Sequence, residues 1–264
     1  MKRLFLILCV ISFAVCGCVG VHEDDDIIPV PVIDPEDGSV DIGTRFFHRS
    51  LAFDFTASWC QYCPKMAATL ASAKLARPGR IIDIAIHQFD TMEAGESGEL
   101  VERFKASSFP VVVFDLDAST WMQSPSEQSM LEHVDWIVPL AASGIAIDAS
   151  SQDSLRIKVK AAIEGIYRIA VAVVEDGIVE EQAGYGPGYV NNSVLRSFLG
   201  GVDGNDLGSL KAGQEARLAF PAASGKDCRI VAYILKQDAG GAWRVDNVAQ
   251  CAVGKIIEYR YEQD

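Results

Sequence analysis

The hydrophobic pattern of the chain changes near Ser143, and this change limits the possible folds more than any other feature. Before it, strand-like and helix-like segments alternate, and after it only short strand-like runs occur. Strands separated by helices imply βαβ units with parallel pairing, whereas short strands separated by turns are typical of an antiparallel sandwich. The sequence therefore predicts an α/β domain at 45–143, followed by an all-β, immunoglobulin-like sandwich domain at 144–264.

Periodicity gives the expected elements of the first domain. Apolar runs predict strands at 51–57, 80–89 and 109–116, and helix-forming segments predict helices at 63–76, 98–107 and 124–143. The sequence Ser124-Pro125-Ser126-Glu127 is expected to act as a capping box for the last of these helices.

The N-terminus has the layout of an export signal. Two basic residues precede an apolar run at 4–15, which is too short for a comfortable membrane span. The run ends in VCGC, which resembles the lipobox of bacterial lipoproteins, and Cys18 fits the acylated position better than Cys16 because a glycine precedes it. We therefore expect a signal peptide at 1–17 and a lipid on Cys18 that attaches the protein to the membrane.

The net negative charge and an acidic N-terminal segment indicate the expected partners and location. The chain has a net charge of −13 and no basic stripe, so nucleic acid is excluded as an expected partner. Residues 18–44 are acidic and contain prolines, which is typical of a solvated tether. An acidic stretch after the lipidated cysteine also resembles the signal that directs some lipoproteins of Bacteroidales to the outer face of the outer membrane. The periplasmic side and the cell surface both remain open.

The segment WCQYCPK, from Trp59 to Lys65, carries the chemistry. Two cysteines at this spacing can hold a metal, form a structural bridge, or exchange with other disulfides. Cys60 follows a predicted strand and opens a predicted helix, where the free N–H groups and the helix dipole favour a thiolate. Cys63 lies almost one turn later, facing inward, so the pair fits an attacking sulfur, predicted to be exposed, and a resolving sulfur. A structural zinc site would need two more ligands at defined spacing, and the histidines are scattered, so we expect no metal.

This motif resembles the active site of thioredoxin-like proteins. The resemblance implies that Asp54 is a buried acid beneath the cysteines, able to move the proton of Cys63. It also implies that Pro110 is a cis-proline opposite the two sulfurs. Many members have threonine or valine before this proline, and Phe109 departs from that pattern.

The other two cysteines of the predicted mature domains suggest a structural bridge. The midpoint between Cys228 and Cys251 falls inside the turn sequence Asp238-Ala239-Gly240-Gly241. A tight hairpin there would place the cysteines opposite each other on one face. Two separate buried thiols are the alternative, because a one-residue shift would put them on opposite faces.

The whole chain resembles thioredoxin-like outer-membrane lipoproteins of Bacteroidales, in which a thioredoxin-like domain precedes a β-sandwich. The residues that carry this are FDFTASWCQYCPKM, and more weakly VVEDGIVEEQ and YVNNSVLRSFLGG. Members often have a histidine where Ser193 stands.

The resulting hypothesis is a lipid-anchored thiol-disulfide oxidoreductase that acts, without a cofactor, on protein thiols or disulfides together with an unidentified redox partner. Cys60, Cys63, Asp54 and Pro110 would do the chemistry, with Trp59, Gln61, Tyr62 and Phe109 around them. Gln61 and Tyr62 match neither the reducing thioredoxins nor the periplasmic oxidase, so the direction of electron flow stays open. The alternative is a surface binding or adhesion protein whose thioredoxin-like domain is only a scaffold.

Overall fold

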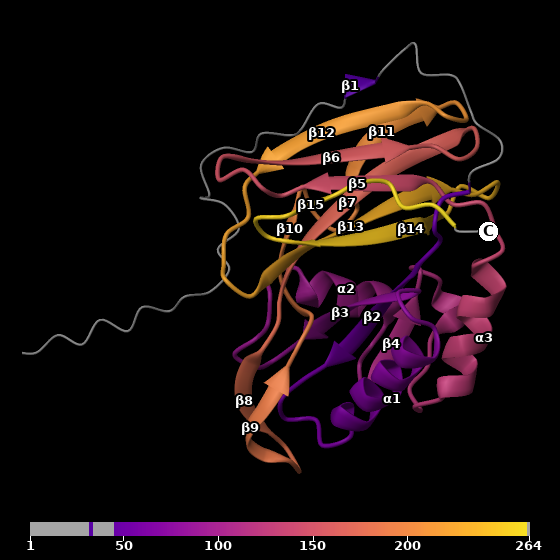
Figure 1. Cartoon of the computed structure of the whole chain (residues 1–264). Coiled ribbons are helices and arrows are strands. Elements are labelled where there is room, and N and C mark those ends of the chain that lie inside the picture. Colours follow the sequence, from indigo (N-terminus) through magenta and orange to yellow (C-terminus); the bar gives the residue numbers. More distant parts are fainter. Residues whose placement is uncertain (1–31, 34–44, 263–264) are drawn as a thin grey trace, which may run out of the picture.

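A computed structural model describes residues 32–33 and 45–262 of the chain. The predicted signal peptide, Cys18 and most of the predicted tether at 18–44 lie outside the described residues. In Figure 1 the described residues form two stacked parts, with three helices around a few strands at one end and layers of strands at the other.

The helical part begins with a βαβ unit. Strand β2 (Ser50–Thr56) leads through a turn into helix α1 (Cys63–Ala76), and β3 (Ile81–His87) pairs with β2 in parallel. There follow helix α2 (Ser97–Phe104), strand β4 (Val111–Phe114), the 3-10 helix η1 (Ala118–Thr120) and helix α3 (Glu127–Ile137). Strand β4 pairs antiparallel with β2. The predicted alternation of strands and helices is confirmed.

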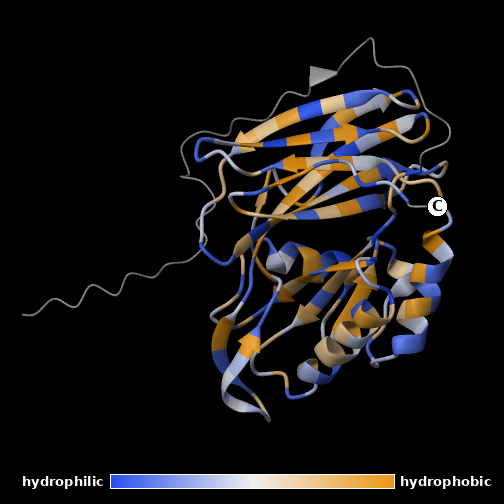
Figure 2. Ribbon diagram, in the orientation of Figure 1, coloured by the Kyte–Doolittle hydropathy of each residue, from blue (hydrophilic) through white to orange (hydrophobic). Residues whose placement is uncertain are grey.

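Burial explains why these strands are hydrophobic throughout. Every residue of β4 and all but the last of β2 are buried, and Figure 2 shows both strands as largely hydrophobic. Helices α1 and α3 cover one face, where Met66, Leu70, Met130 and Val134 pack on Val112. Helix α2 covers the other face through Leu100 and Phe104. A sheet covered on both faces has no solvent side, so its strands need no polar alternation.

The β-rich part follows α3. Its strands are β5 (Gly144–Asp148), β6 (Ser154–Lys160), β7 (Gly165–Glu175), β8 (Ile178–Gln182), β9 (Gly186–Asn191), β10 (Val194–Leu199), β11 (Asn205–Leu210), β12 (Glu215–Pro221), β13 (Cys228–Gln237), β14 (Trp243–Ala252) and β15 (Ile256–Ile257). One sheet has the order β1-β12-β6-β5-β15, where β1 is Val32–Ile33, within the predicted tether. Strands such as β6 alternate between buried and less buried residues, as expected for a sheet with one solvated face.

The second large sheet belongs to both parts. Its order is β14-β13-β7-β10-β3-β2-β4, with β11 paired to β7 as the eighth strand. The junction is parallel pairing of β10 with β3, at Val194 and Ala85. A single cluster of buried side chains reaches from Phe53 in β2 to Tyr233 in β13. The two parts therefore share a sheet and a core, an arrangement that the sequence analysis does not anticipate, and the boundary near Ser143 stays a prediction.

A second cluster of buried side chains fills the space between the two large sheets. It includes Ile157 of β6, Val171 of β7 and Ile230 of β13. The short strand-like runs after Ser143 thus form antiparallel sheets around a hydrophobic core, as predicted. Strands β8 to β11, at 178–210, were not predicted, because they lie between the strand-like runs that the sequence shows at 167–176 and 215–222.

One local prediction is wrong. Helix α3 begins at Glu127, and Ser126 is its N-cap, with the Ser126 side-chain oxygen accepting a hydrogen bond from the Ser129 N–H. The predicted capping box placed Ser124 in this role. Ser126 has the extended backbone that an N-cap requires, so the proline before it lies outside the helix.

Candidate active site at the Cys60–Cys63 turn

Cys60 and Cys63 lie in the turn that joins β2 to α1. They form a disulfide, with Cα atoms 5.5 Å apart. Helix α1 begins at Cys63, so Cys60 precedes the first helical turn instead of opening it. Both cysteines are buried, with 5% of Cys60 and 2% of Cys63 exposed, so the predicted exposed sulfur at Cys60 is wrong in the oxidised state.

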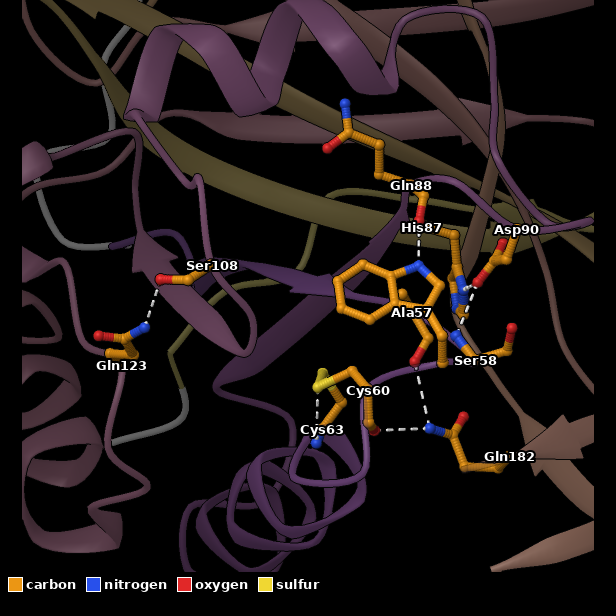
Figure 3. The surroundings of a disulfide bond; sticks show 11 residues. Ala57, Ser58, Cys60, Cys63, His87, Gln88, Asp90, Ser108, Gln123 and Gln182 are labelled. Carbon is orange, nitrogen blue, oxygen red and sulfur yellow. Dashed lines mark hydrogen bonds and ion pairs between the residues drawn. A yellow bond between two sulfur atoms is a disulfide. The ribbon is translucent and has the colours of Figure 1, made fainter. Parts of the chain in front are cut away.

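The helix N-terminus contacts the sulfur of Cys60 directly. The backbone N–H of Cys63 donates to Sγ of Cys60 at 3.1 Å, and it also lies 3.3 Å from the Cys60 carbonyl oxygen (Figure 3). A free N–H at a helix start favours negative charge on the atom that it faces. After reduction this contact would stabilise a thiolate on Cys60.

Asp54 lies in β2 beneath the disulfide and is buried. Its Oδ1 has no hydrogen-bond partner. Burial raises the pKa of Asp54 to about 7, and the negative charge of Asp83 adds to this effect. A carboxyl group with such a pKa can both accept and release a proton near neutral pH.

A cavity connects this carboxyl group to the disulfide. Its volume is about 430 Å³, and Asp54, Cys63, His87, Gln182 and Tyr189 are among the residues that line it. This space is large enough for several water molecules, each of which needs about 30 Å³. Asp54 and Cys63 thus face a common cavity, which is the arrangement that proton transfer between them requires.

The Phe109–Pro110 peptide bond is cis, as the sequence resemblance implied. Phe109 packs against a small cluster of Ala57, Cys60 and Cys63. Its ring stacks on Trp59, with centroids 5.6 Å apart and planes 18° apart. Phe109 therefore links the proline loop to the cysteine turn through an aromatic contact.

The exposed residues around the disulfide are mostly aromatic or polar. Trp59 is 51% exposed, although its indole N–H donates to the Gln88 carbonyl at 3.0 Å. Tyr62 is also exposed, as is Gln61 beside it. Aromatic side chains of this kind offer contact area to another polypeptide.

His87 and Asp90 hold the turn from the side of β3, a role that the sequence analysis missed. His87 is buried, and its Nδ1 lies 2.8 Å from Oδ2 of Asp90. The same carboxylate oxygen accepts the Ser58 N–H at 2.7 Å (Figure 3). Burial opposes ionisation of Asp90, but the hydrogen bonds from His87, Ser58 and Met92 outweigh it and lower the pKa of Asp90. The ionised acid is therefore a stable anchor for the start of the turn.

A hairpin from the β-rich part holds the turn from the opposite side, and this contact was also missed. Strands β8 and β9 form a separate two-stranded sheet, which reaches down beside the helical part in Figure 1. The side chain of Gln182, at the end of β8, donates to the carbonyl oxygens of Ala57 and Cys60 (Figure 3). The segments VVEDGIVEEQ and YVNNSVLRSFLGG include β8 and the end of β9 but not the turn between them, and they were the only sequence signal for the hairpin.

The predicted Cys228–Cys251 bridge is wrong. Cys251 is a free, buried thiol, whereas Cys228 is disulfide-bonded, so the two are not joined to each other. In the β13–β14 pairing, Cys251 lies opposite Ile230. The turn between these strands is centred half a residue later than predicted, because Gln237 pairs with Trp243, and this moves each pairing partner by one residue. A bulge between Ile234 and Leu235 shifts the register by another residue. A total shift of two residues keeps every side chain on its predicted face of the sheet. Both cysteines therefore lie in the same core cluster, but they are not opposite each other.

Two further observations concern metal ligands and membrane-spanning helices among the described residues. Within residues 45–262 no three histidine, cysteine or acidic side chains come together as a metal site would require. In the part of the chain that the structure describes, the helices are too short or too polar to cross a bilayer.

Comparisons with known proteins give a family from the sequence and a fold from solved structures. The family described as "Outer membrane protein Omp28" matches residues 99–256, more than half of the chain. HBP35 of Porphyromonas gingivalis has a similar structure, with a TM-score of 0.65 at 17% identity, over 80% of this chain and 76% of that one. A crystal structure of a protein from Agrobacterium tumefaciens gives 0.57 at 12% identity, over 78% and 94%. At these identities the similarity shows a shared fold alone. No curated protein matches the sequence.

Proposed function

Because the chain belongs to the Omp28 family of outer membrane proteins, we propose that it is a thioredoxin-like thiol-disulfide oxidoreductase of the cell envelope, attached to the outer membrane by a lipid on Cys18. One observation carries the redox proposal. The N–H at the start of α1 is bonded to the sulfur of Cys60, and the partner sulfur of Cys63 faces the cavity that also contains Asp54.

The exchange reaction follows from these positions. In the reduced protein the Cys60 thiolate attacks one sulfur of a substrate disulfide, and the other substrate sulfur leaves as a thiolate. Cys63 then loses its proton to Asp54 and attacks Sγ of Cys60, which releases the second substrate sulfur as a thiolate. Two electrons pass from the cysteine pair to the substrate, and the two substrate thiolates take up two protons. The reverse sequence oxidises a substrate dithiol.

Substrates of the proposed enzyme are protein thiols or disulfides. The exposed rings of Trp59 and Tyr62 beside the disulfide support this class, because a small thiol would need no such surface. The proposal applies to either orientation of the anchored protein, toward the periplasm or toward the cell surface.

A trapping experiment tests the mechanism. We expect Cys63→Ala to accumulate mixed disulfides on Cys60, because attack persists while resolution is lost. The Cys60→Ala variant is the matched control and should accumulate none, since the helix N–H that favours a thiolate is bonded to the sulfur of Cys60. Absence of adducts from Cys63→Ala, together with no exchange by the intact protein, would remove the proposal.

The second candidate, a binding or adhesion protein that uses this part as a scaffold, is favoured by the burial of both sulfurs. The reduction potential of the Cys60–Cys63 pair separates the two functions. A potential between those of thioredoxin and the periplasmic oxidase, about −270 to −120 mV, supports exchange, whereas a potential below about −300 mV supports a fixed bridge. Fractionation of a Cys18→Ser variant tests the anchor, and retention in the membrane fraction would contradict it.

A further inference from the structure

The hairpin β8–β9, residues 178–191, is fixed at its base. Just before it, Asp176 accepts the N–H of Ser193 at 2.7 Å and forms an ion pair with Arg229 of β13. Arg229 also donates to the hydroxyl of Ser193 at 2.6 Å. The carbonyl oxygen of Ser193 also accepts the N–H of Ala85 in β3. These contacts at the base of the hairpin, to two strands of the shared sheet, restrict movement of the hairpin relative to that sheet.

The other end of β8 holds the cysteine turn. Gln182 is 2% exposed, and its Nε2 donates to the Ala57 oxygen at 3.1 Å and to the Cys60 oxygen at 2.8 Å. Both amide hydrogens are thus used on the turn. The next residue, Ala183, donates its backbone N–H to the Ser58 oxygen at 2.8 Å. Carbonyls of three turn residues therefore depend on a segment more than 120 positions away in sequence.

The bond to Cys60 affects the group that contacts the reactive sulfur. The Cys63 N–H is shared between Sγ of Cys60 at 3.1 Å and the Cys60 oxygen at 3.3 Å. Gln182 binds the same oxygen at the shorter distance of 2.8 Å. A buried carbonyl needs a donor, and with Gln182 present it has one. Without Gln182 it would compete with the sulfur for the Cys63 N–H.

We propose that Gln182 is a positioning residue of the redox site, which satisfies the Cys60 carbonyl and so leaves the Cys63 N–H to stabilise the Cys60 thiolate. The inference rests on the proposed redox function. It adds that a residue of the β-rich part controls the reactivity of the cysteine pair. Gln182 touches no reacting atom and acts through the Cys63 N–H.

The consequence for the redox equilibrium has a definite sign. A hydrogen bond to the thiolate stabilises the reduced protein, so weakening that bond favours the disulfide. Hydrogen bonds to charged groups are stronger than those between neutral groups, so loss of part of one is expected to change the equilibrium constant about tenfold. For a two-electron couple that is about 30 mV toward more negative potential.

The test uses Gln182→Met in the otherwise unchanged protein. Methionine has similar length and no N–H to donate. We expect the equilibrium with glutathione to shift about tenfold toward the oxidised protein. We also expect iodoacetamide to react several-fold more slowly with reduced Cys60 at pH 7, measured by mass spectrometry of its peptide, with the difference disappearing at higher pH. A merely structural role for Gln182 would not move this pH profile.

Two controls sharpen the result. Glu180→Gln removes the carboxylate that accepts the Thr91 hydroxyl at 3.1 Å, a contact of the same hairpin away from the cysteines, and should leave both readouts unchanged. Gln182→Glu preserves the shape but lacks the donors when ionised, and should shift both readouts in the same direction as Gln182→Met. If neither Gln182 variant folds, amide exchange of Cys63 in the reduced wild type decides, and rapid exchange overturns the proposal.

The possible failures are distinguishable. A wild-type protein that does not equilibrate with glutathione removes the proposed function, whatever Gln182 does. A wild type that equilibrates normally, with Gln182→Met unchanged in potential and in pH profile, overturns the role of Gln182 alone.

Discussion

The turn that carries Cys60 and the strand that carries Cys251 place cysteine in opposite surroundings. The sulfur of Cys60 accepts the N–H of Cys63, and its turn is held by Asp90, just after β3, and by Gln182 of the β8–β9 hairpin. Cys251 lies among the apolar side chains of the core between the two large sheets, where burial raises the pKa of its thiol. Both cysteines are nearly inaccessible, so exposure alone does not separate a reactive sulfur from an inert one. The difference lies in whether donors are present to receive negative charge.

The largest expected effect compares these two cysteines directly. We predict that Cys60→Ser abolishes disulfide exchange with insulin, whereas Cys251→Ser leaves the rate unchanged, because the N–H of Cys63, the first residue of α1, donates to the sulfur of Cys60. The measurement is the rate of insulin reduction with dithiothreitol as electron donor. Substantial exchange by Cys60→Ser would mean that the reactive sulfur has been assigned to the wrong region.

A second prediction concerns Asp54 and the resolution step. In Asp54→Asn we expect Cys63 to attack about a hundredfold more slowly, which is at the lower end of the effect of a general base. Reaction of the reduced protein with a chromogenic aryl disulfide separates the steps, since attack releases the first thiolate and resolution the second. Only the second phase should slow. In the wild type that phase should accelerate as pH rises through about 7, where Asp54 loses its proton.

The same substitution predicts a change in stability. The pKa of Asp54 is about 7 in the folded protein and 3.8 when the group is exposed. Between these values the folded state holds a proton that the unfolded state has lost, so the wild type loses stability as pH rises from about 4 to about 7. Asp54→Asn should therefore be the more stable protein above pH 7, by about 2–4 kcal/mol, and the difference should vanish below pH 4. Equilibrium urea unfolding at pH 4 and pH 8 measures this, and equal stability at both pH values would contradict it.

For Cys251 a smaller effect is expected, on stability alone. Native protein should resist alkylation at this position until it unfolds. Replacement by serine should cost about 1–3 kcal/mol, because a hydroxyl is buried without a good partner. Thermal unfolding and mass spectrometry after alkylation check both parts. Rapid alkylation of Cys251 in native protein would show that the core between the sheets opens readily.

The smallest predicted effect tests the aromatic contact beside the active turn. Phe109→Val removes a ring that stacks on Trp59, an interaction worth about 0.5–1.5 kcal/mol. We expect kcat/KM for a protein disulfide to fall about two- to tenfold and the fluorescence of Trp59 to shift to longer wavelength. An unchanged rate with a small aryl disulfide is the control for intact chemistry.

Sequence reasoning succeeded where the determining interactions are local. Cys60 and Cys63 are three positions apart, so the start of one helix brings their sulfurs together whatever the rest of the chain does. Asp54 lies in the strand just before this turn, whereas the cis bond before Pro110 is distant in sequence and was implied only by the resemblance to thioredoxin-like proteins. The Cys228–Cys251 prediction failed because the register between two strands of ten residues each depends on the turn and on one bulge. The spacing of the cysteines reveals neither.

The hairpin β8–β9 escaped prediction for a different reason. It packs little of its own surface into a core, and Val179 and Val190 are exposed, so its hydrophobic alternation is weak. Glycines at 186 and 188 with positive φ weaken the strand signal further. Contacts such as that from Gln182 to Cys60 join residues that no local pattern relates. They follow only from the pairing of β10 with β3, which places the end of this hairpin beside the turn.

That pairing also bears on how such a protein could have arisen and diversified. Modular proteins exchange domains freely when each domain closes its own sheet and a linker separates them. Here β10 continues the sheet of β3, and buried side chains from both parts fill one cluster. Recombination at a single point near Ser143 would leave an open sheet edge on each product and an apolar face without its partner. The two parts are therefore expected to be inherited together.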